Sequence, residues 1–118
     1  MKNLFIEYPK CTTCQKAKKW LEGKKVVFEA RHIVEANPTK QELKKWIKTS
    51  ELDLRKWFNT SGLKYKELNL KDKLDGMSDD EKITLLASDG MLVKRPILIT
   101  EKGVCPGFKE DVWKELLK

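Results

Sequence analysis

Hydrophobic and polar positions repeat with two different periods along the first third of the chain. The runs at 3–8 and 26–33 are rich in β-branched and aromatic residues, which is typical of strands. Between them, apolar residues recur at helical spacing from 11 to 23, and Gly23 suits the end of that helix. This order with short links predicts a βαβ unit, in which the two strands are parallel.

The middle of the chain carries helical spacing only. One helix is expected to begin at an N-cap formed by Asn37 or Thr39, and another to begin at Ser78, which acidic residues follow directly. A further short helix is expected over 51–62. We therefore predict that residues 38–90 are all-helical.

Strand character returns near the end of the chain. The stretch at 96–100 is apolar, and "VCPGF" after a tight turn predicts a brief antiparallel partner strand. The closing "KEDVWKELLK" predicts a helix that turns Val112, Trp113 and Leu116 toward a core.

These elements together predict one α/β domain over 1–118. Its fold class is a thioredoxin-like mixed sheet with a helical insertion. The core of the domain is expected over 1–37 and 91–118, and the insertion over 38–90.

Charge and cysteine count narrow the functional classes. The net charge is +7 and comes mostly from lysines, which alternate with acidic residues and form no continuous basic block. This favours a solvated surface with acidic or anionic partners, without direct nucleic-acid binding. We expect a cytoplasmic protein with no membrane partner, because no apolar run suits a signal peptide or a membrane helix. Three cysteines, an odd number, argue against a closed disulfide framework.

The stretch "EYPKCTTCQKAKKWL" places two cysteines at the predicted junction of strand and helix. A helix N-terminus favours negative charge, so Cys11 is expected to have a lowered thiol pKa, with Lys10 and Lys16 adding positive potential. Cys14 follows three residues later, on the same face. In the redox interpretation Cys11 is the catalytic nucleophile and Cys14 the resolving thiol.

Two other interpretations of the cysteine pair are weaker. A structural zinc site needs four ligands, and only His32 and Cys105 remain as isolated soft ligands. An inert buried pair does not suit two cysteines that lie among lysines. We therefore expect no metal and no bound cofactor, an apolar position for Cys105, and a structural role for His32.

A proline that begins a strand cannot complete the strand ladder and often marks a cis bond. In a thioredoxin-like layout, Pro96 would face the cysteines and present backbone groups to an extended substrate. Arg95, directly before it, is expected to bind an anion near Cys11. The alternative is a surface arginine beside an ordinary trans proline. The cysteine pair favours the first interpretation, so Arg95 and Pro96 are the expected substrate-binding residues.

The stretches "CTTCQKAKKWL", "FNTSGLKYKELNLKDKL", "LLASDGMLVKRPILIT" and "GFKEDVWKELL" together resemble the arsenate reductase/Spx family, in the same order and over nearly the whole chain. The resemblance implies a thioredoxin-like fold with a helical insertion. It also implies a nucleophile at Cys11 and, at Arg95, one of the three arginines with which arsenate reductases hold an oxyanion. Asn59 and Gly107 stand at or near the positions of the other two.

The resemblance implies three functions. The first is a thiol–disulfide oxidoreductase that acts on a thiol, a disulfide or a small oxyanion and takes electrons from an external donor, either glutathione with glutaredoxin or thioredoxin. The second is an Spx-like redox-sensing regulator that binds the RNA polymerase α subunit, although Leu52 replaces the glycine that Spx proteins use there. The third is arsenate reduction.

Overall fold

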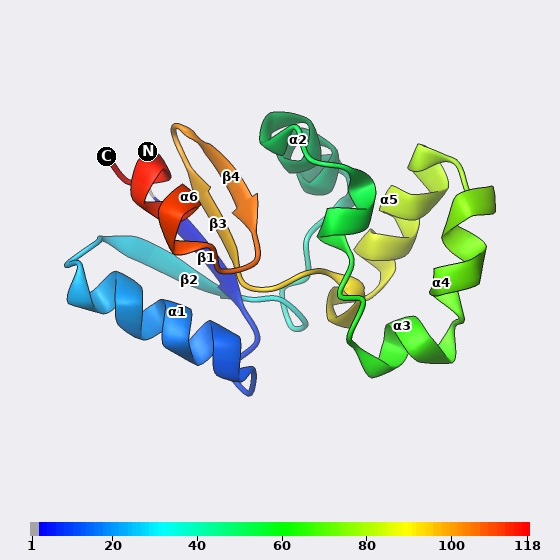
Figure 1. Ribbon diagram of the computed structural model, residues 1–118, viewed down its shortest axis with the longest axis horizontal. Coiled ribbons are helices and arrows are strands. Elements are labelled where there is room, and N and C mark those ends of the chain that lie inside the picture. The colour runs from blue at the N-terminus through cyan, green and yellow to red at the C-terminus, as the bar shows by residue number, and fades with distance from the viewer. Residues whose placement is uncertain (1–2) are drawn as a thin grey trace.

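A four-stranded mixed sheet organises the computed structural model, which describes residues 3–118 (Figure 1). The strands are β1 (Asn3–Glu7), β2 (Phe28–His32), β3 (Ile97–Thr100) and β4 (Gly103–Pro106), in the spatial order β2-β1-β3-β4. The β1 strand is parallel to β2 and antiparallel to β3, and β3 is antiparallel to β4. This is the predicted thioredoxin-like sheet, and it confirms the parallel βαβ unit.

Helices connect the strands of this sheet and follow the last one. They are α1 (Thr12–Gly23), α2 (Lys40–Ser50), α3 (Leu63–Glu67), α4 (Leu70–Lys73), α5 (Asp79–Ser88) and α6 (Glu110–Leu116). Three short 3-10 helices are η1 (Leu54–Trp57), η2 (Leu74–Gly76) and η3 (Gly90–Leu92). The segment from α2 to η3 lies between β2 and β3 in the chain and extends to one side of the sheet (Figure 1).

The strands bury both faces because neighbouring side chains point to opposite sides. Phe5 and Leu98 pack with residues of α1 and α6 on one face. Ile6, Ile97 and Ile99 pack with residues of the insertion on the other. The sheet therefore separates two apolar clusters. The end of β1 in the sheet determines where α1 begins.

Capping residues define where the two longer insertion helices begin. The Thr39 hydroxyl accepts a hydrogen bond from the Glu42 N–H, and the Glu42 carboxylate accepts one from the Thr39 N–H. Ser78 and Glu81 form the same reciprocal pair at α5. The predictions for Thr39 and Ser78 are confirmed, whereas the Asn37 side chain instead donates to the Ala87 carbonyl at 2.7 Å.

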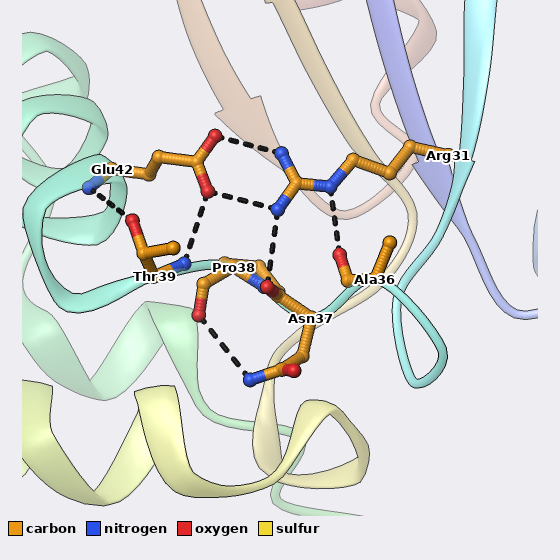
Figure 2. A network of polar contacts seen from close by, with 6 residues as sticks. All are labelled: Arg31, Ala36, Asn37, Pro38, Thr39 and Glu42. Atoms are coloured by element: carbon orange, nitrogen blue, oxygen red, sulfur yellow. Dashed lines mark hydrogen bonds and ion pairs between the residues drawn. The ribbon is translucent and has the colours of Figure 1, made fainter.

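A network centred on Arg31 ties the end of β2 to the start of α2 (Figure 2). Its guanidinium donates to both carboxylate oxygens of Glu42 at 2.7 and 2.8 Å, and to the carbonyls of Ala36 and Asn37. The hydrogen bonds from Arg31 lower the pKa of Glu42 to about 2, against the opposing effect of partial burial. These bonds attach the helical insertion to the sheet at the point where the chain passes from β2 to α2.

Several sequence expectations for element boundaries are wrong. The helix predicted over 51–62 is only the single turn η1, because Phe58 leaves it in extended conformation and bridges Val93. The strand predicted from position 26 begins at Phe28, and Val27 is 83% exposed. Val112 does not face the core: it is 42% exposed, since the adjacent Trp113 takes the buried side of α6.

Within residues 3–118, no helix is both long and apolar enough to cross a membrane.

Candidate functional site

Cys11 occupies the N-cap of α1, in the turn that leaves β1. Its extended backbone, with φ −81° and ψ 122°, lets its Sγ accept a hydrogen bond from the Cys14 N–H at 3.4 Å. The Cys11 N–H in turn donates to the Tyr8 carbonyl at 2.9 Å, which closes the turn. The expected position of Cys11 at the helix N-terminus is confirmed, with the helix itself beginning at Thr12.

The surroundings of Cys11 favour its thiolate. Partial burial raises the pKa of Cys11, but hydrogen bonds from the Cys14 backbone and thiol and from the Arg95 guanidinium outweigh it. The net effect is a lowered pKa, which increases the fraction of reactive thiolate near neutral pH. The charged group responsible is Arg95, whereas Lys10 and Lys16, predicted to contribute, are both exposed.

Cys14 has the opposite character although it lies one turn away. Its side chain is fully buried, and burial together with the neighbouring Cys11 raises its pKa to about 12. The pair therefore combines a partly buried sulfur with a lowered pKa and a fully buried sulfur with a raised pKa. This asymmetry allows an attacking and a resolving thiol to be distinguished.

Arg95 reaches the cysteines from the segment before β3. Its guanidinium carbon lies 5.0 Å from the centre of the Tyr8 ring, a cation–π contact that orients the side chain. Its buried Nε has no hydrogen-bond partner among the described residues. The Arg95–Pro96 bond is cis, as the strand-initial proline suggested. The Pro96 carbonyl accepts a hydrogen bond from the Gly107 N–H at 2.7 Å. This carbonyl, which was expected to face an extended substrate, is therefore already bonded within the protein.

A cavity of about 320 Å³ opens beside Cys11. It is lined by Cys11, Thr13, Asn59, Ser61, Lys94, Arg95, Gly107, Phe108 and Lys109. Asn59 and Gly107, matched to the arginine positions of the family, therefore do lie at this site although neither carries a charge. The cavity instead receives positive charge from Lys94 and Lys109, which we call the two cavity lysines.

The cavity lysines do not stand out in the amino-acid sequence. They come from different segments, and lysine is so common in this chain that neither stands out. The only signal was adjacency, because Lys94 directly precedes Arg95 and Lys109 closes the "GFK" stretch after Gly107. Folding brings both to the cysteine because the start of β3 lies beside the end of the antiparallel β4, and the Gly107 N–H donates to the Pro96 carbonyl.

The remaining soft side chains lie elsewhere. Cys105 is buried in the cluster below α6, as expected for an apolar position, and burial raises the pKa of its thiol. His32 is structural: its Nδ1 accepts the N–H groups of Val34 and Glu35, both at 3.1 Å, and so closes the turn after β2. Within residues 3–118, no group of three or more His, Cys, Asp or Glu side chains is arranged to hold a metal ion.

Comparison with known proteins gives consistent matches over the whole fold. Residues 6–116 match the model of the ArsC family. The chain is 56% identical over 111 residues to the uncharacterized protein YusI of Bacillus subtilis strain 168, covering 94% of each chain. It is 33% identical to the global transcriptional regulator Spx of Streptococcus pneumoniae, covering 94% of this chain and 81% of that one. The crystal structure of an ArsC family related protein from Bacteroides fragilis superposes with a TM-score of 0.95 at 53% identity, covering 98% of both chains.

Proposed function

Because the chain belongs to the ArsC family, we propose that it is a thiol–disulfide oxidoreductase with Cys11 as nucleophile and Cys14 as resolving thiol. The observation that carries this proposal is the opposed environment of the two sulfurs. Cys11 is accessible, caps α1 and is stabilised as thiolate by Arg95, while Cys14 is buried and hydrogen-bonded to it.

The reaction proceeds in two exchanges. The Cys11 thiolate attacks one sulfur of a substrate disulfide, so that a Cys11–substrate disulfide forms and the other substrate thiolate leaves and takes up a proton. Cys14 then loses its proton and attacks the Cys11 sulfur, which forms the Cys11–Cys14 disulfide and releases the second thiol. Two electrons pass from the pair to the substrate, and an external thiol donor of the glutathione–glutaredoxin or thioredoxin type restores them.

The raised pKa of Cys14 is consistent with its role in the second of these two exchange steps. Part of the rise comes from the neighbouring Cys11 sulfur. Once Cys11 is bound in a mixed disulfide its negative charge is gone, so Cys14 ionises more readily at the moment when it must attack. Cys14 is therefore held protonated until the first exchange has occurred.

Turnover of a mixed disulfide of glutathione tests the proposal. The reduced protein is supplied with a thioredoxin or a glutaredoxin system, and consumption of NADPH is followed. With at least one donor, we expect turnover above the rate of that donor system alone, and this excess should disappear in the Cys11→Ser variant. No excess with either donor, or an excess that Cys11→Ser retains, would refute a Cys11-dependent oxidoreductase.

A second candidate function, redox-dependent regulation, is supported by the identity to the Streptococcus pneumoniae Spx regulator. In that case the Cys11–Cys14 pair would switch binding to the RNA polymerase α subunit. A pull-down against the α C-terminal domain, with oxidised and with reduced protein, decides between a regulator and an enzyme. Binding in one state only supports regulation, and binding in neither removes it.

A third candidate is arsenate reduction, supported by the cations around the Cys11 cavity. Arg95 and the cavity lysines supply positive charge where Asn59 and Gly107 do not. Lysine lacks the planar two-point contact of arginine with an oxyanion, so arsenate is expected to bind weakly. An arsenate-dependent NADPH oxidation assay with the same donors tests this candidate, and a rate above that with the glutathione mixed disulfide would make arsenate the preferred substrate.

A further inference from the structure

A second cavity, of about 570 Å³, adjoins the Cys11 cavity and shares the two cavity lysines with it. Its opposite wall comes from η1 and the segment after it, which contribute Arg55, Lys56 and Phe58. We call this second cavity the basic groove. Because Lys94 and Lys109 line both spaces, the basic groove lies directly beside the cavity of Cys11.

The charge of the basic groove is largely uncompensated. Four cations, Arg55, Lys56, Lys94 and Lys109, line it together with one carboxylate, Asp53. Arg55 forms an ion pair with Asp75 and Asp53 accepts the backbone N–H of Arg55. Within residues 3–118, by contrast, no ion pair engages the three lysines, all of which are exposed.

Other lysines of the chain show that such pairing is available. Lys40 and Lys44 both contact Asp80, and Lys18 contacts the buried carboxylate of Glu7. Many other exposed lysines of residues 3–118 also lack an ion pair, so the basic groove is distinguished by the gathering of three unpaired lysines around one cavity. An uncompensated cluster in a concave site attracts anions more strongly than scattered exposed charges do.

We propose that the basic groove binds an acidic segment of a protein substrate, whose disulfide then reaches Cys11. This inference rests on the oxidoreductase function proposed above. The Cys11 cavity alone has the volume of a small-ligand site, so a small disulfide would be accommodated there without the groove. A carboxylate that contacts Lys56 must lie beyond the cavity lysines. In a peptide, such a carboxylate would belong to a residue several positions away from the cysteine that reacts.

The same geometry favours a protein over a nucleic acid. The groove adjoins the cavity of Cys11, and the proposed nucleophile there has a reaction partner in a cysteine-containing peptide and none in a phosphodiester chain. The Asp53 carboxylate also lines the groove, where it would repel a continuous row of phosphates. Separated carboxylates can avoid Asp53 and still contact the lysines.

Matched peptides test the proposal. Three peptides carry one central cysteine, activated as its 2-thiopyridine disulfide, with acidic, amide or lysine residues on both sides. Excess reduced protein attacks the peptide sulfur, thiopyridone is released, and its absorbance gives a single-turnover rate. At low ionic strength we expect the acidic peptide to react on the order of tenfold faster than the amide peptide and the lysine peptide to react slowest. Added salt should reduce these differences.

A charge-reversing variant locates the effect in the groove. Lys56→Glu should lower the ratio of acidic to amide peptide rates several-fold. The matched control is Lys71→Glu, an identical charge change at an exposed position of α4, far from the sheet (Figure 1), which should leave this ratio unchanged. Thermal melts check that both variants fold, and Lys56→Gln replaces Lys56→Glu if the reversal unfolds the chain, with a smaller loss expected.

The outcomes separate the inference from the function on which it depends. Equal rates for all three peptides, or equal effects of the two charge reversals, would overturn the acidic-segment proposal and leave the oxidoreductase intact. Release no faster than with Cys11→Ser, for every peptide, would overturn the oxidoreductase. A single-stranded oligonucleotide that inhibits more strongly than a cysteine-free acidic peptide of equal charge would assign the groove to nucleic acid and overturn the proposal.

Discussion

Two thiol regions lie on either side of one glycine and have opposite character. Cys11 faces a cavity with Arg95 and two lysines, whereas Cys105 is 2% exposed in an apolar cluster with Trp113. Gly107 lines the Cys11 cavity, while its carbonyl accepts from the indole N–H of Trp113 at 3.1 Å and from the Cys105 thiol at 3.7 Å.

The contrast shows that environment shifts the pKa of the same residue type in opposite directions at the two positions. Burial raises the pKa of Cys105 and outweighs the opposing effects of Trp113 and Lys109. Burial also raises the pKa of Cys11, but the hydrogen bonds at the helix N-terminus and the charge of Arg95 outweigh this effect and lower the pKa. Cys11 should therefore behave as a nucleophile, and Cys105 as a small apolar side chain.

The largest expected difference is between two variants that each remove one sulfur, Cys11→Ser in the first region and Cys105→Ala in the second. Cys11→Ser should lower disulfide turnover by a factor of about 1,000 or more, because a serine hydroxyl stays protonated and does not exchange with sulfur. Cys105→Ala should change turnover by less than about twofold, since its sulfur takes no part. The coupled assay with the glutathione mixed disulfide measures both, and equal losses in the two variants would abolish the distinction.

Within the first region, Cys14→Ser should separate the two exchanges. The first attack by Cys11 remains, but the mixed disulfide cannot be resolved, so turnover falls by a factor of about 100. Intact-mass spectrometry should show a stable adduct of one substrate thiol on Cys11. If no adduct accumulates while turnover is retained, an external thiol resolves Cys11 and Cys14 has another role.

Arg95→Gln sharpens the comparison by making Cys11 more like Cys105. Without the guanidinium, the pKa of Cys11 should rise, and its alkylation rate at pH 7 should fall by a factor of about 10. Arg95→Lys should retain part of the effect. The rate of iodoacetamide modification at Cys11, measured across pH, reports the change, and an unaltered profile would show that Arg95 does not tune the thiol.

The smallest expected effect is on stability in the second region. Cys105→Ser replaces a buried thiol by a hydroxyl in an apolar cluster and should cost about 1–2 kcal/mol in unfolding free energy. Cys105→Ala serves as the control that removes the sulfur without adding a polar group. Urea unfolding compares them, and a Cys105→Ser variant as stable as wild type would mean that the position is not as apolar as the packing indicates.

The sequence predicted the parts of the site that depend on local rules. A cysteine pair after a strand, the caps Thr39 and Ser78, and the proline before β3 each follow from nearby residues. The short turn η1 was mistaken for a helix because its end depends on the distant bridge between Phe58 and Val93. The cavity lysines were missed for the same reason, since only the folded sheet brings Lys94 and Lys109 together.

The site-resolved pKa of Cys11 tests the central claim most directly. Reduced protein is alkylated with iodoacetamide at a series of pH values, and peptide mapping by mass spectrometry separates Cys11 from Cys14 and Cys105. Alkylation of Cys11 should rise with pH and level off above its pKa, with a midpoint below that of an ordinary cysteine, while Cys14 stays unreactive until strongly alkaline pH. A Cys11 midpoint at or above the ordinary value, or Cys14 reacting first, would contradict the assignment of Cys11 as the nucleophile.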